Sequence, residues 1–171
     1  MQAQRTLMLI MAIVLLAVLP TAHARRWSIV PTTLPLEYYV QVGLGHPNLS
    51  TLIAPIDPTG STGTFGRMQL FDFNVTKGVD AASTLLGSLC GYAIQASATA
   101  DFHGVEVEVL AYHDGSLNGT ISLQGLINAG TNEIAIVGRI GNFRGACGYG
   151  IITFLNSTTT LALYHHQLFF L

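Results

Sequence analysis

The sequence predicts an all-β domain, an antiparallel sandwich or barrel, on three observations. Apolar and polar residues alternate in short runs, as in 105–109 (VEVEV), which is typical of strands. Turn signals such as Asp114-Gly115 and Gly141-Asn142 separate these runs at intervals of about 8 to 15 residues. No helical periodicity is present after the first 24 residues.

Residues 1–24 have the three-part order of a secretory signal peptide. Arg5 supplies a positive charge, an apolar run extends from Leu7 to Leu19, and Ala22-His23-Ala24 offers a cleavage site. A helix of that run spans only about 20 Å, against the ~30 Å core of a bilayer. We therefore expect a cleaved signal and a secreted protein, the alternative being a retained signal anchor.

The rest of the chain divides into an arm and one domain. Residues 25–36 contain two prolines and no periodicity, which predicts an extended N-terminal arm, and residues 37–171 form the β domain. Within the domain, the prolines and glycines of segment 43–63 predict a long loop with turns. Further strands are indicated around 121–127, 134–136, 151–155 and 161–170. The 18 glycines fit the bulges and bends of a closed barrel.

The composition of the chain limits the classes of molecule that it is expected to bind. Charged residues make up 9% of the chain and hydrophobic residues 50%, with a net charge of −2. A weakly acidic chain without a basic run is a poor candidate for nucleic acid or an anionic membrane surface. A chain this apolar buries much surface in a barrel, or binds an apolar ligand or another copy of itself.

Secretion would allow oxidation of the cysteines and glycosylation of the asparagines. In an oxidising compartment Cys90 and Cys147 form either one disulfide or two separately buried thiols, and the sequence leaves both open. Four Asn-X-Ser/Thr sequons are candidate glycosylation sites: Asn48, Asn74, Asn118 and Asn156.

Common signatures of catalysis and cofactor binding are missing. The sequence has no Gly-X-Ser-X-Gly elbow and no P-loop, and no helix pattern follows the glycines of segment 138–150. His165 and His166 are adjacent in a predicted strand, so they point to opposite faces and do not readily share a metal. We expect no metal, no haem or copper, and no other cofactor.

Three carboxylates lie within predicted strands. Glu106 and Glu108 share one strand face, and we expect that face outside the barrel, because two buried like charges are costly. Asp72 lies in the apolar run 70–73 (LFDF) and is either a buried, hydrogen-bonded group or a site residue.

Three blocks of sequence resemble the plant dirigent family. The first runs from Phe65-Gly66 through Phe71-Asp72 and the Thr-Lys-Gly turn to Gly91-Tyr92, and the second is 114–125 (DGSLNGTISLQG). The third and most specific is 133–150, which contains Gly141-Asn142-Phe143-Arg144-Gly145. The resemblance covers about residues 37–170, nearly all of the predicted domain.

The resemblance implies an eight-stranded antiparallel β-barrel of the allene oxide cyclase/dirigent type, secreted to the apoplast, glycosylated and assembled as a homodimer or homotrimer. Members of the family have no redox centre. A separate laccase or peroxidase makes phenoxy radicals, typically from coniferyl alcohol, and the barrel steers their coupling to one handedness, as in lignan formation. Some members use an acid for dehydration or cyclisation through quinone methides.

This chain departs from the family pattern at polar positions. Gln41 stands where the first strand often has Asp, and Phe73 where the second has another Asp. Asn132 replaces an Arg before Glu133, and Cys147 replaces another Arg. These departures argue against an acid-assisted route.

Three functions therefore remain as hypotheses. The first hypothesis is a coupling guide without intrinsic oxidase activity. Its candidate pocket residues are Asp72, Tyr92, Tyr112 and Phe143, with Arg144 at the barrel mouth. The alternative is that the aromatic residues belong to the barrel core and that Arg144 forms a surface ion pair.

A lyase or cyclase acting on a phenolic substrate needs a positioned acid, for which Asp72 and Glu133 are the candidates. The third hypothesis is a non-catalytic wall or defence protein that binds phenolics or carbohydrate.

Overall fold

The computed structural model describes residues 35–60, 64–98, 104–128 and 130–171. The predicted signal peptide, 1–24, and all but the last two residues of the predicted arm lie outside them. The described residues form nine strands: β1 (Leu36–Gly43), β2 (Leu49–Ile53), β3 (Met68–Thr76), β4 (Leu85–Gln95), β5 (Gly104–His113), β6 (Asn118–Ile127), β7 (Thr131–Gly141), β8 (Gly148–Ser157) and β9 (Leu161–Phe170). None of these residues belongs to a helix that is long and apolar enough to cross a membrane.

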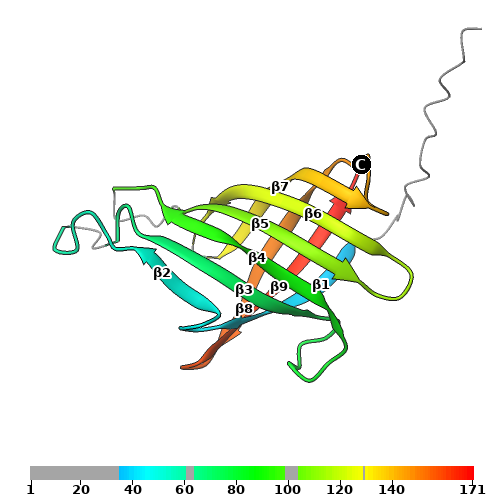
Figure 1. Cartoon of the computed structure of the whole chain (residues 1–171), viewed down its shortest axis with the longest axis horizontal. Helices are drawn as coiled ribbons and strands as arrows, with labels where there is room; N and C mark the ends of the chain where they lie inside the picture. The colour runs from blue at the N-terminus through cyan, green and yellow to red at the C-terminus, as the bar shows by residue number, and fades with distance from the viewer. Residues whose placement is uncertain (1–34, 61–63, 99–103, 129) are drawn as a thin grey trace, which may run out of the picture.

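Eight of the strands close into an antiparallel barrel, as predicted. The order is β1-β9-β8-β7-β6-β5-β4-β3, and β1 also pairs with β3. That last pairing is short, covering only Tyr39–Gln41 of β1 against Asn74–Thr76 of β3. Beyond it β1 and β3 separate, and β2 pairs with β3 on the outside of the barrel (Figure 1). Strand β2 lies within segment 43–63, so the prediction of loop alone was wrong there.

The barrel interior is filled by alternate residues of every barrel strand. Tyr38, Leu110, Ile121, Leu123 and Leu168 are all fully buried, with 0% of their surface exposed. Burying side chains of this size is the main stabilising contribution, about 1.5–3 kcal/mol for each large aliphatic residue.

Strand β5 has its faces opposite to the prediction. Glu108 is only 2% exposed and faces the interior, whereas Val109 is 36% exposed on the outside. The reason is that Leu110 and Tyr112, which share a face with the glutamates, are buried. Because side chains alternate strictly along a strand, burying that pair also turns Glu106 and Glu108 inward.

The outer face of the barrel carries many apolar side chains. On the consecutive strands β3–β7, six of them are at least 36% exposed: Leu70, Leu85, Val109, Leu126, Val137 and Ile140. A run of outward apolar residues across adjacent strands is unusual for a monomer surface.

Candidate functional site

A cavity of about 210 Å³ lies inside the barrel, at the end where β1 and β3 separate. Its apolar wall includes Phe71 and Phe73, whose rings stack with centroids 5.1 Å apart, and the half-buried Tyr164. Leu49 of the outer strand β2 also contributes to the lining, so β2 covers the gap between β1 and β3. An apolar cavity of about 150 Å³ is enough to hold benzene, so this one has room for one substituted ring.

The carboxyl groups of the cavity both come from β5. Glu106 and Glu108 both line it, two residues apart on one face of the strand, and their carboxyl groups share a hydrogen bond. Burial raises the pKa of Glu106, although its hydrogen bond with Glu108 opposes the rise. Burial, the charge of Glu106 and that hydrogen bond together raise the pKa of Glu108 well above its ordinary value. Both shifts favour the protonated form of the pair, and the rise is greater for Glu108 than for Glu106.

The register of the sheet makes the space beside these carboxyl groups. Glu106 lies opposite Ala93 of β4 and Gly125 of β6, and Glu108 lies opposite Gly91 of β4. A β-carbon on Gly91 would lie 2.9 Å from the tip of the Phe71 ring and 2.0 Å from a β5 carbonyl oxygen. Small cross-strand neighbours thus leave room both for the carboxyl groups and for the ring of Phe71.

A buried histidine and tyrosine complete the polar part of the interior. Nδ1 of His166, on β9, lies 3.2 Å from the hydroxyl of Tyr38, on β1, in a hydrogen bond. Burial, and to a lesser degree His165, lowers the pKa of His166 to about 3, so the ring is neutral near pH 7. Burial and then Glu108 raise the pKa of Tyr38 well above its ordinary value. The two aromatic groups are consequently uncharged, and Glu106 is the group in this cluster that ionises first.

Two of the sequence-predicted pocket residues meet, but at the other end of the barrel. Tyr112 and Phe143 are both 4% exposed, and their rings meet edge to face with centroids 5.9 Å apart. The Tyr112 hydroxyl donates a hydrogen bond of 3.1 Å to Asp114, and burial followed by Asp114 raises its pKa to about 12. Neither ring lines the cavity, so both occupy the core, the alternative left open by the sequence.

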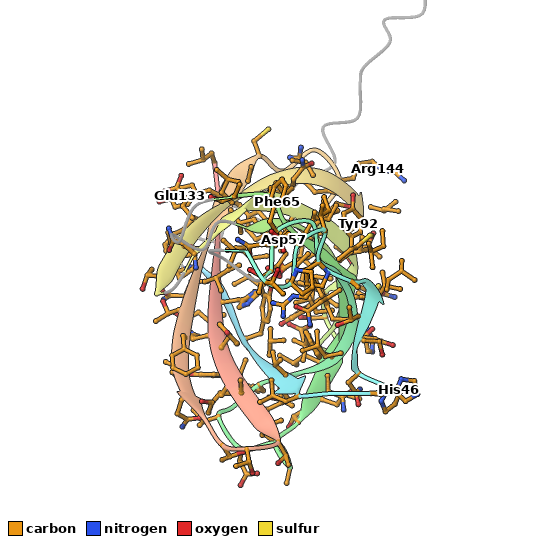
Figure 2. The ribbon with its side chains drawn as sticks, turned by 90° about the vertical axis from the view of Figure 1, so that its left-hand side faces the viewer. His46, Asp57, Phe65, Tyr92, Glu133 and Arg144 are labelled. Atoms are coloured by element: carbon orange, nitrogen blue, oxygen red, sulfur yellow. The ribbon has the colours of Figure 1, made fainter. Side chains whose placement is uncertain are left out.

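The other predicted site residues lie outside the cavity lining. Asp72 is exposed on β3, neither buried nor facing the interior, because Phe71 and Phe73 on either side of it face inward. Tyr92 is half-buried on β4, and Glu133 and Arg144 are exposed. Figure 2 shows Arg144 and Glu133 at the periphery of the barrel. The sequence analysis thus missed the cavity carboxylates Glu106 and Glu108. The large apolar side chains of Leu110 and Tyr112, on the same face of β5, indicated that this face is buried.

The two cysteines are free, exposed thiols, so neither predicted alternative, a disulfide or two buried thiols, is observed. Cys90 lies in the middle of β4, next to β3 and β5, whereas Cys147 directly precedes β8. Strands β4 and β8 are not neighbours in the barrel, which explains why the thiols do not meet.

All four predicted sequon asparagines are exposed, a condition that glycosylation requires: Asn48, Asn74, Asn118 and Asn156. Their modification stays a prediction. Within the described part of the chain, no group of three or more His, Cys, Asp or Glu side chains is placed to hold a metal ion.

Comparison with known proteins assigns the family. The family model described as "Dirigent-like protein" matches residues 34–170, which is most of the chain. The chain belongs to the dirigent-like family. No curated protein sequence matches this dirigent-like protein.

Solved structures agree with that assignment. The pterocarpan synthase dirigent protein GePTS1 is 24% identical with a TM-score of 0.71, over 80% of this chain and 87% of that one. The pterocarpan synthase dirigent protein PsPTS1 is 25% identical with a TM-score of 0.70, over 80% of this chain and 92% of that one. The dirigent-like chain therefore shares their eight-stranded barrel.

Proposed function

We propose that this protein guides the coupling of phenoxy radicals by holding one phenolic ring in the barrel cavity. The observation that carries the proposal is an aromatic-walled cavity of about 210 Å³ in a chain of the dirigent-like family. Radical coupling is intrinsically fast, so the protein only has to shield one face of the ring and present the other. Phe71, Phe73 and Tyr164 supply the apolar walls for that purpose.

In this proposal the radicals come from a separate laccase or peroxidase in the apoplast, as for coniferyl alcohol in lignan formation. Export through residues 1–24 and glycosylation at the four exposed sequons belong to the same proposal. A second or third copy of the chain covers the exposed apolar residues on the outside of β3–β7, which gives a homodimer or homotrimer.

The test is the coupling of coniferyl alcohol by a laccase, with and without the purified protein, followed by chiral chromatography. We expect an enantiomeric excess in one product. Ala93→Phe, which fills the cavity, should return the product to a racemate, whereas Ala111→Phe on the exposed face of β5 should not. Racemic products at saturating wild-type protein would refute the function for that substrate.

A second candidate function is acid-assisted dehydration of a phenolic substrate through a quinone methide. The specific observation is the buried carboxyl group of Glu108 in the cavity, whose pKa burial raises, and the similarity to two pterocarpan synthase dirigent proteins is consistent with it. Glu108 donates its proton to the leaving hydroxyl of a 4-hydroxybenzylic alcohol, while Glu106 accepts the phenolic proton. The products are water and the quinone methide, and a proton shift between the glutamates restores the pair.

This candidate predicts that Glu108→Gln abolishes dehydration of a 4-hydroxybenzylic alcohol. Asp72→Asn and Glu133→Gln, at the two exposed carboxylates suggested by the sequence, should leave the rate unchanged. A rate that is unaffected by Glu108→Gln would exclude the glutamate pair from proton transfer.

A further inference from the structure

The cavity has an uncompensated acidic end. Glu108 is 2% exposed, and its Oε2 atom lies within the barrel without any hydrogen-bond partner. Glu106 lines the same space, and no described lysine or arginine does so. The neutral His166 supplies no positive charge near pH 7. Two carboxyl groups therefore face one small, apolar space, and the described residues that line it provide no cation for them.

Ionisation of either carboxyl group would bury a charge that has no partner in the cavity, which is costly. A ligand hydroxyl would satisfy the unpaired Oε2 atom, but it would leave the charge uncompensated. An ammonium group would supply both the hydrogen-bond donors and the charge. The walls add to this preference, because the faces of Phe71, Phe73 and Tyr164 attract cations as well as aromatic rings.

We propose that the cavity binds a phenolic amine, with its ammonium group held by Glu106 and Glu108 and its single ring between the aromatic walls. This inference deepens the proposed function by naming the substrate class, and it rests on the proposal that the cavity takes a phenolic ring. A cavity of about 210 Å³ accommodates one ring with a short side chain.

Binding of a cation has a consequence for protons. An ammonium group beside the pair favours the ionised form of both carboxyl groups, so its binding promotes the release of a proton from the pair into solvent. The other titratable groups facing the pair are Tyr38, Tyr164 and His166, on β1 and β9. The cavity residues from β3, β4 and β6 are not titratable. The affinity for an amine should therefore rise with pH as the pair loses its proton, up to the pH at which the amine itself deprotonates.

Isothermal titration calorimetry with three probes of similar shape tests the inference. Tyramine carries an ammonium group, 4-ethylphenol is neutral, and 3-(4-hydroxyphenyl)propionate is an anion. We expect tyramine to bind at least about tenfold more tightly than 4-ethylphenol, and the anion to bind most weakly. Titrations in two buffers with different enthalpies of ionisation should show proton release with tyramine alone.

Glutamate-to-glutamine variants remove the negative charge of the cavity and keep its shape, so they test which of the two causes the preference for tyramine. Glu106→Gln and the double variant Glu106→Gln with Glu108→Gln should remove the preference for tyramine and retain binding of 4-ethylphenol. Glu133→Gln, an exposed carboxylate on β7, is the matched control and should change nothing. If a cavity variant fails to fold, the probe preference and proton release of the wild-type protein still decide the question.

Three outcomes would overturn the inference in different ways. If 4-ethylphenol binds as tightly as tyramine and no proton is released, the ammonium site is refuted while the cavity remains a phenol site. If no probe binds and coniferyl alcohol coupling is also racemic, both the ammonium site and the proposed function are refuted. An enantiomeric excess with coniferyl alcohol but no preference for tyramine would refute the amine class alone.

Discussion

The buried histidine of β9 makes the stability of the barrel depend on pH. Burial lowers the pKa of His166 from 6.5 to about 3 in the folded protein. Between these two values the unfolded chain binds a proton that the folded protein does not. The contribution to stability is therefore fully present above pH 6.5 and is lost progressively as the pH falls towards 3.

The size of the effect follows from the same two pKa values. At pH 5 the unfolded state is stabilised by about 1.36 kcal/mol for each pH unit below its pKa, which makes about 2 kcal/mol for this residue. That is a large fraction of the 5–15 kcal/mol that separates folded from unfolded states in ordinary domains.

The assay is urea unfolding of the wild-type protein and of His166→Gln at pH 7.5 and pH 5. The wild-type protein should lose about 2 kcal/mol more than the variant between these conditions. The variant loses the hydrogen bond with Tyr38 at both pH values. The change in its stability between the two pH values, compared with that of the wild type, therefore measures the effect of protonating His166 alone. His113→Gln, at an exposed position, should behave as the wild type. Equal pH dependence in wild type and His166→Gln would refute the reasoning.

Three further predictions concern other parts of the barrel. Because burial raises the pKa of Glu108, the contribution of this residue to stability should fall as the pH rises above the ordinary value of 4.5. In urea unfolding, Glu108→Gln should therefore gain stability relative to the wild type as the pH rises; a constant difference between the two would contradict the prediction. Gly87→Ala places a β-carbon 1.8 Å from a carbonyl oxygen of β5, and we expect it to lower the free energy of unfolding by at least about 3 kcal/mol in urea unfolding. Gly115→Ala, with φ of 93° and open space around the residue, should lower it by only about 1–2 kcal/mol. Equal losses for the two variants would be inconsistent with the observed register between β4 and β5. Cys90 and Cys147 should both react with a thiol reagent in the native protein without reduction, and a count of zero thiols would reveal a disulfide.

The strands were predictable, but the orientation of β5 was not read correctly. Alternation between valine and glutamate in 105–109 identifies a strand without saying which face is inside. Leu110 and Tyr112 decide it, since a register that buried Val107 and Val109 would have exposed these larger side chains. The interior then has to accommodate the two glutamates, which it does opposite Gly91, Ala93 and Gly125.

The candidate site was harder to predict than the fold because a cavity is made by residues that are far apart in sequence. Its lining comes from seven of the eight barrel strands and from β2. Asp72 attracted attention as a carboxylate in an apolar run, yet the stacked rings on either side of it face inward and leave it outside. The departures at Gln41 and Asn132 argued against an acid in the pocket, whereas the structure places two carboxyl groups there from another strand.

By itself the sequence determined an all-β chain, its main turns and its resemblance to the dirigent family, because these depend on local periodicity and on the order of short motifs. Only the tertiary structure decided which face of β5 is buried, that the two thiols are separate, and that Glu106 and Glu108 share a cavity with Phe71 and Phe73. Those properties depend on the closure of β1 onto β3 and on the register between strands, which bring together residues that no local pattern connects.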